Sequence, residues 1–340
     1  MNSHRIPSLD GLRAISIALV IVSHLARWKH IAFAFPEAYG ELGVRIFFVL
    51  SGFLISQLLF QEQERSSSIS LRDFYVRRAF RIFPAAFVFL AVVTVVYWHE
   101  MRWYHLAAAV FYAANMDSSR PWIFGHLWSL SIEEQFYLLW PFALKKWRQH
   151  KVAILLCAVI LTPVFHAALY AFKARGGIVG SLPLYTDQLA MGCLLAIYAR
   201  RLPKIGVYLA LAMTAAMFLI PLYPAISPAR TLFMLFVLQP ALNLSIAAVI
   251  LHVMQVPYRV LNWSPVAWLG RISYSLYLWQ EAFCSNPAQH HWYSLTLATL
   301  VCASVSYYCV EQPMLRLREK WTRKSGSEQP SALQPNSLPA

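Results

Sequence analysis

The sequence predicts an all-α, polytopic membrane protein with about ten transmembrane helices and one short re-entrant or interfacial segment. Composition is the first reason: of 340 residues, 59% are hydrophobic and only 13% are charged, and the mean hydropathy is +0.49. A soluble domain has about 45–50% apolar and about 25% charged residues. Apolar stretches long enough to span a bilayer recur along the chain, and basic residues gather in the connections between them.

The predicted spans are apolar runs of about 18 to 23 residues, the length that crosses a bilayer as a helix. In chain order they cover about 9–28, 42–60, 80–98, 127–144, 151–172, 182–199, 204–222, 230–252, 267–284 and 292–312. A further apolar piece, 104–116, is too short to span and is assigned to the re-entrant or interfacial segment. Residues 1–318 form the predicted transmembrane domain, and 319–340, basic and then rich in Pro and Ser, are expected to be a disordered cytoplasmic tail.

Basic residues give the predicted helices an orientation. With both termini in the cytoplasm, most of the 29 lysines and arginines fall on the inner side of the membrane. Counting 104–116 as a full span would place the basic tail outside, so we reject that topology. Membrane orientation and contact with anionic lipid headgroups account for the net charge of +14, and nucleic acid is not expected as a partner.

The cysteines and the first apolar stretch exclude two other classes of protein. None of the five cysteines forms a CxxC pair, so neither a zinc site nor a disulfide framework is expected, and no metal is predicted. The first apolar stretch exceeds signal-peptide length and lacks a small-residue cleavage site, so we expect a retained helix.

The first span contains the main candidate for chemistry. It carries Asp10 and Arg13 near its start and His24 near its end. At 100° per residue, Arg13 and His24 project from one helix face, roughly 16 Å apart along the axis. A histidine in this position could be bonded to a neighbouring helix, or it could act as a base or nucleophile. The alignment with Arg13 favours the catalytic interpretation.

Two further clusters carry charge into or beside apolar segments. Four arginines crowd the approach to the third span, where they serve either as positive-inside charge or as a phosphate clamp: Arg72, Arg77, Arg78 and Arg81. Two adjacent carboxylates, Glu133 and Glu134, lie in the fourth span at a depth similar to that of His24. A carboxylate facing a histidine would orient it, whereas pairing with Arg45 or Arg120 would be structural.

Other polar residues in apolar segments are candidate substrate contacts. Asp187 begins one span, and Tyr277 and Gln280 lie along another. Stabilisation of a helix N-terminus and helix packing are the structural alternatives. The complete set of candidate substrate-binding residues is Asp10, Arg45, Ser51, His126, Trp128, Asp187, Tyr277 and Gln280.

Five sequence motifs occur along the chain in a characteristic order. They are LDGLRAISIALVIVSH at 9–24, GVRIFFVLSGFLI at 43–55, FYVRRAFRIFP at 74–84, HLWSLSIEEQFYLLWP at 126–141 and SYSLYLW at 273–279. In these motifs the chain resembles the acyltransferase type 3 family of integral membrane acyltransferases. The family's basic residue and histidine fall on Arg13 and His24, and its RxxR motif falls on Arg78 and Arg81.

One further motif of the family matches this chain, and two positions differ from the residues that the family often has. The carboxylate motif of the family falls on Glu133 and Glu134. Tyr185 stands where the family often has Arg, and Gln280 stands where it often has His. If that His takes part in the chemistry of relatives, it cannot do so here.

The resemblance implies a membrane O-acyltransferase of the bacterial inner membrane, with acyl-CoA, usually acetyl-CoA, as the donor. A hydroxyl of a surface or lipid-linked carbohydrate, or of a small secreted metabolite, would be the acceptor. His24 would act as base or acyl carrier, oriented by Glu133 or Glu134, and the donor phosphates would be held by Arg13, Arg72, Arg77, Arg78 and Arg81. A proton-coupled transporter is the alternative class, because intramembrane His, Arg and Glu also mark ion pathways. Acyl chain length and oligomeric state stay open.

Overall fold

The computed structural model describes residues 7–28, 37–172, 181–224, 227–284 and 292–327, and over these residues it contains helices and no strands. This confirms the predicted all-α class. The α-helices are α1 (Pro7–Trp28), α2 (Ala38–Ser66), α3 (Leu71–Val96), α4 (Trp103–Val110), α5 (Leu127–Lys146), α6 (Lys151–Ala171), α7 (Thr186–Tyr198), α8 (Val207–Leu219), α9 (Pro228–Phe233), α10 (Gln239–Gln255), α11 (Ser264–Arg271), α12 (Ser273–Cys284), α13 (Trp292–Ser306) and α14 (Gln312–Ser327). Two π-helical segments, Met234–Leu238 and Tyr307–Glu311, join α9 to α10 and α13 to α14.

The described helices make this an integral membrane protein, but they do not confirm ten spans. Six helical stretches are long and apolar enough to cross a bilayer: Ser8–Ala26, Ala38–Ser66, Leu71–Val96, Arg148–Ala171, Pro228–Gln255 and Trp292–Glu319. Helices α7 and α8 have 13 residues each, so each is about 20 Å long, less than the ~30 Å hydrocarbon core. Helix α5 carries two glutamates and two lysines, and the predicted span 267–284 is divided into α11 and α12.

The apolar piece at 104–116 is a short helix and a turn. Helix α4 has eight residues and is therefore about 12 Å long, too short to cross a bilayer. The turn after it is fixed by a bond from His105 Nδ1 to Asp117 Oδ2 of 2.5 Å. Partial burial opposes ionisation of Asp117, but hydrogen bonds from His105 and Ser119 outweigh it and hold the pKa of this carboxyl below its ordinary value.

Close helix packing places the first two helices at the centre of the site. Helix α2 packs against α1 and α7, and α1 also packs against α11. The α2–α7 contact requires glycine, because a Cβ on Gly52 would overlap the carbonyl oxygen of Leu189 and one on Gly192 would overlap that of Val49. Glycines that let two backbones approach in this way are typical of helix contacts in membranes.

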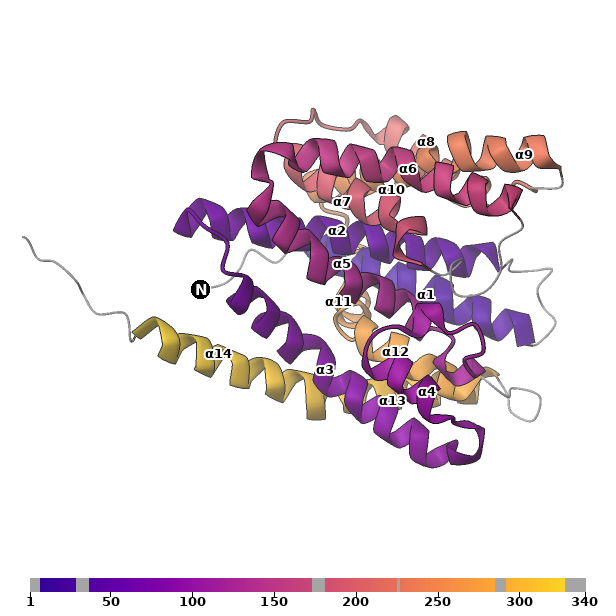
Figure 1. Cartoon of the computed structure of the whole chain (residues 1–340), viewed down its shortest axis with the longest axis vertical. Helices are drawn as coiled ribbons and strands as arrows, with labels where there is room; N and C mark the ends of the chain where they lie inside the picture. Colours follow the sequence, from indigo (N-terminus) through magenta and orange to yellow (C-terminus); the bar gives the residue numbers. More distant parts are fainter. Residues whose placement is uncertain (1–6, 29–36, 173–180, 225–226, 285–291, 328–340) are drawn as a thin grey trace, which may run out of the picture.

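Helix α3 carries the arginine cluster that was predicted from the sequence. Ser70 caps the start of α3 by accepting a hydrogen bond from the backbone N–H of Asp73. The first half of α3 lies beside α14 along the lower left edge of the molecule (Figure 1). Helix α14 ends at Ser327, inside the predicted tail, and residues 328–340 lie outside the described residues. The predicted disorder of that tail stays a prediction.

Candidate functional site

A cavity lies between α1, α2, α3, α5 and α12. Seven residues predicted from the sequence line it: Arg13, Ser51, Arg78, Arg81, Glu133, Glu134 and Tyr277. The remaining wall is apolar or weakly polar and comes mainly from α2, α5 and α12. The helices thus bring together motifs that are far apart in the sequence.

Positive charge is concentrated on one side of this cavity. Arg81 lies close enough to Arg13 and Arg78 for both of them to repel its guanidinium charge. The guanidinium of Arg78 lies 3.9 Å from the centre of the Tyr137 ring, and its Nε, which lies 3.8 Å from Glu134 Oε1, makes no hydrogen bond. Neighbouring guanidinium groups, one of them with an unused donor, favour an anionic ligand that accepts bidentate hydrogen bonds.

The two adjacent glutamates face the arginines, and the predicted pairing of either with His24 is wrong. The hydroxyl of Ser51 donates a hydrogen bond of 2.5 Å to Glu133 Oε1, while Glu134 faces Arg78. The structural alternative is wrong as well, since Arg45 binds Asn243 and Gln239, and Arg120 binds backbone carbonyls. The sequence grouped the two glutamates with His24, whereas they line the cavity with Arg13, Arg78 and Arg81, because helix packing sets the side on which each carboxylate points.

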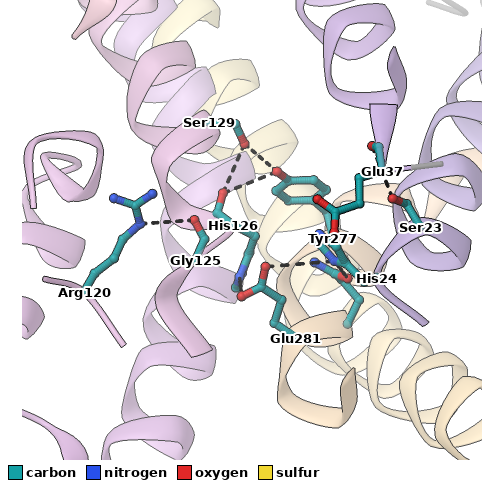
Figure 2. A network of polar contacts seen from close by, with 10 residues as sticks. Ser23, His24, Glu37, Arg120, Gly125, His126, Ser129, Tyr277 and Glu281 are labelled. Carbon is teal, nitrogen blue, oxygen red and sulfur yellow. Dashed lines mark hydrogen bonds and ion pairs between the residues drawn. The ribbon is translucent and has the colours of Figure 1, made fainter. Parts of the chain in front are cut away.

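His24 instead contacts α12. Its Nδ1 lies 2.6 Å from Oε1 of Gln280 and 4.0 Å from Oε1 of Glu281. The other oxygen of Glu281 lies 3.4 Å from Nδ1 of His126. Figure 2 shows the Glu281 carboxylate between the two histidines. The indole of Trp122 packs edge-on against the His24 ring, with centroids 5.7 Å apart.

Tyr277 connects the cavity to the His24 site. Its ring lines the cavity, and its hydroxyl lies 2.5 Å from the Ser129 hydroxyl and 3.3 Å from the carbonyl oxygen of His126 (Figure 2). Because Tyr277 and Glu281 are four residues apart, they lie on one face of α12. The cationic cavity and the histidine site are therefore neighbours along a single helix face.

Two of the predicted clamp arginines lie elsewhere. Arg72 is exposed in the first turn of α3, and Arg77 forms an ion pair with Glu62 of α2. Neither lines the cavity. Successive helical residues diverge by 100°, so Arg77 points away from the direction that Arg78 takes. The predicted five-arginine clamp is reduced to Arg13, Arg78 and Arg81.

Two of the predicted substrate contacts, Arg45 and Asp187, belong to a second polar region outside the cavity lining. Asn243 joins Arg45 to Asp187, with bonds of 2.9 Å and 2.6 Å. Trp128 packs against Tyr185, the residue where relatives often have Arg, with ring centroids 4.8 Å apart. Asp10 is buried at the far end of α1, where its carbonyl oxygen meets Gly270 of α11. None of these residues lines the cavity.

Glu281 is the site residue that sequence reasoning missed. It is 2% exposed and follows Gln280 directly in an otherwise apolar segment. An acidic residue within a membrane segment is by itself a signal of function. Among the described residues, no group of three His, Cys, Asp or Glu is arranged to hold a metal ion.

Comparison with known proteins identifies the family. Residues 6–311 match the family model described as an acyltransferase domain. The chain is 30% identical over 358 residues to the peptidoglycan O-acetyltransferase OatA of Listeria monocytogenes, covering 91% of this chain and 56% of that protein. It is 28% identical over 357 residues to the O-acetyltransferase OatA of Staphylococcus aureus, covering 91% of this chain and 57% of that protein.

These matches cover only part of each relative. The chain spans a little more than half the length of these curated relatives. No solved structure matches it. Since the family model covers nearly all of the described helices, from α1 to the second π-helical segment, the chain belongs to this family of integral membrane acyltransferases.

Proposed function

We propose that this protein is a membrane O-acetyltransferase that moves an acetyl group from cytoplasmic acetyl-CoA to a hydroxyl of a cell-envelope carbohydrate. The observation that carries the proposal is the cavity in which Arg13, Arg78 and Arg81 converge. Three guanidinium groups in one cavity suit the phosphates of coenzyme A. The relatives named above, which are O-acetyltransferases, support acetyl as the group and peptidoglycan as the first acceptor to test.

The donor would enter from the end of the bundle that bears Arg13. Arg13 and His24 are both on α1, roughly 16 Å apart along its axis. A donor whose phosphates bind Arg13, Arg78 and Arg81 could extend its pantetheine arm past Tyr277 and present the thioester near His24. Glu133 and Glu134 keep the arginines in place when the donor is absent, since each faces the cavity beside them.

His24 would act as general base on the acceptor. The hydroxyl proton passes to His24 as the oxygen attacks the thioester carbonyl, and the bond between carbonyl carbon and sulfur then breaks. The coenzyme A thiolate leaves and takes the proton from His24, so the enzyme returns to its starting state. Transfer of acetyl to His24 itself is the alternative route, and it would leave labelled acetyl on the protein when no acceptor is present.

The test is donor turnover by purified protein in proteoliposomes, measured as coenzyme A release and acetylated muropeptide. We expect His24→Ala to abolish transfer, and Arg78→Ala/Arg81→Ala to weaken acetyl-CoA binding by at least tenfold. Arg72→Ala is the matched control, because Arg72 lies on α3 outside the cavity. Its kinetics should equal those of wild type.

Two results would refute the proposal. Acetyl transfer by His24→Ala near the wild-type rate would exclude His24 as the general base. Undiminished acetyl-CoA binding by the double arginine variant would exclude the donor site. Uptake of a solute that depends on a proton gradient, without acetyl-CoA turnover, would instead support a transporter.

A further inference from the structure

We propose that Gln280 and Glu281 are positioning residues that hold His24 with its proton on Nδ1 and leave Nε2 free to act as the base. This inference rests on the proposed role of His24. It assigns a function to the two consecutive α12 residues that contact that side chain. One of them, Gln280, is a position at which this chain departs from its family.

The protonation of His24 follows from the acceptors around Nδ1. The amide oxygen of Gln280 can only accept a hydrogen bond, so at 2.6 Å Nδ1 must carry the proton and donate it. Glu281 Oε1, also an acceptor when ionised, lies 4.0 Å from the same nitrogen. If the Gln280 amide were rotated to present its NH₂ group, Nδ1 would have to be a bare acceptor beside a carboxylate, which is unfavourable. The hydrogen bond to the Gln280 oxygen, with the Glu281 carboxylate nearby, therefore selects the Nδ1–H tautomer.

Burial fixes these two side chains while leaving His24 accessible. Gln280 is fully buried and Glu281 is 2% exposed, whereas the His24 side chain is 22% exposed. Gly125 makes room for the carboxylate, because a Cβ there would come 2.8 Å from Glu281 Oε2. The same oxygen faces Nδ1 of His126 at 3.4 Å. The carboxylate is thus held between two imidazoles on a packed surface (Figure 2).

The arrangement suits a base that becomes positively charged during the reaction. When Nε2 takes the proton of the acceptor hydroxyl, His24 becomes an imidazolium whose Nδ1–H still donates to Gln280. The new charge faces the Glu281 carboxylate, which stabilises it in a buried environment. An amide cannot replace a histidine as a base, but its oxygen can fix the tautomer of the histidine that is present.

The kinetic test separates the acceptor oxygen from simple packing. Gln280→Met keeps the length of the side chain and removes the acceptor, and Gln280→Glu keeps an acceptor at the same position. We expect Gln280→Met to lower kcat about 10- to 100-fold with an unchanged KM for acetyl-CoA. We expect Gln280→Glu to retain most of the activity. Gln312→Met is the matched control, since Gln312 is on α14 and binds Arg316 outside the site.

A parallel pair tests the carboxylate. Glu281→Gln should lower kcat by a similar factor at unchanged KM, and Glu62→Gln, which breaks the ion pair with Arg77 outside the cavity, should not. Wild-type kcat in Gln280→Met would overturn the inference. Equal losses of kcat in Gln280→Met and Gln280→Glu would also overturn it, because that pattern would show that Gln280 acts through packing and not through its acceptor oxygen.

A readout that does not depend on turnover separates this inference from the proposed function. In ¹⁵N-histidine-labelled protein at alkaline pH, the His24 signal, assigned by its absence in His24→Gln, should show a proton on Nδ1. Gln280→Met/Glu281→Leu should shift that signal toward the Nε2–H form. An Nε2–H signal in wild type would overturn the tautomer even if transfer is observed. An Nδ1–H signal in a protein that transfers no acetyl would refute only the proposed function.

Discussion

Replacing Arg78 by lysine tests whether the cavity recognises phosphate through guanidinium geometry or through charge alone. The Arg78 guanidinium lies 3.9 Å from the centre of the Tyr137 ring, an arrangement worth about 0.5–2 kcal/mol. Lysine keeps the charge but loses the planar fork that binds phosphate with two parallel bonds. Loss of one charged hydrogen bond costs about 1.5–3 kcal/mol, and 1.4 kcal/mol is a factor of ten in affinity. We therefore expect Arg78→Lys to weaken acetyl-CoA binding about 10- to 100-fold.

The assay for this prediction is the KM for acetyl-CoA in proteoliposomes, at saturating acceptor. Loss of a group that binds the donor equally in the ground and transition states raises KM and leaves kcat unchanged. Arg72→Lys on the exposed face of the same helix is the control and should match wild type. An unchanged KM in Arg78→Lys would refute phosphate recognition by this residue. An equal rise in both variants would point to surface charge as the cause.

Three further predictions concern stability, measured by thermal unfolding in detergent. Gly192→Ala should cost about 1–3 kcal/mol by forcing α2 and α7 apart, whereas Gly206→Ala, in open space, should be nearly neutral; equal effects would contradict the packing argument. Tyr277→Phe should cost about 1–2 kcal/mol, because the hydrogen bond between the Tyr277 and Ser129 hydroxyls is lost, and an unchanged midpoint would exclude this bond as a stabilising contact. Asp117→Asn should cost about 1–3 kcal/mol at neutral pH. Since the pKa of Asp117 is lowered from 3.8, that difference should begin to shrink as the pH falls through 3.8 and be lost below the lowered pKa of the folded protein, and a constant difference would contradict the ionic role.

The class of fold was readable from the sequence, but the number of spans was not. Composition and apolar runs are properties of local sequence, and a chain with 59% hydrophobic residues must bury them in lipid or in itself. Whether an apolar run becomes one helix depends on its neighbours. The run 267–284 is divided at Ile272, where α11 packs against α1 through Gly270. No local pattern reports that contact.

The sequence predicted which residues belong to the candidate site better than it predicted which of them contact one another. The motifs around Arg13, Arg78 and Glu133 contribute to one cavity; the sequence grouped Arg13 with Arg78 but assigned Glu133 to His24. The partner of His24 did not follow. Adjacent helical residues differ by 100° in direction, and the rotation of α5 turns Glu133 toward Ser51.

Sequence alone determined that the chain is helical, enters the membrane, and carries charged groups that lipid would not tolerate unless they were paired or functional. It determined this because hydrophobicity and helical period are local properties. Only the tertiary structure decided which charges meet. Close packing through Gly52 and Gly192 sets the distance between α2 and α7, and the rotation of α12 places Gln280 and Glu281 against His24. Such choices depend on contacts between segments more than 100 residues apart, which no local pattern encodes.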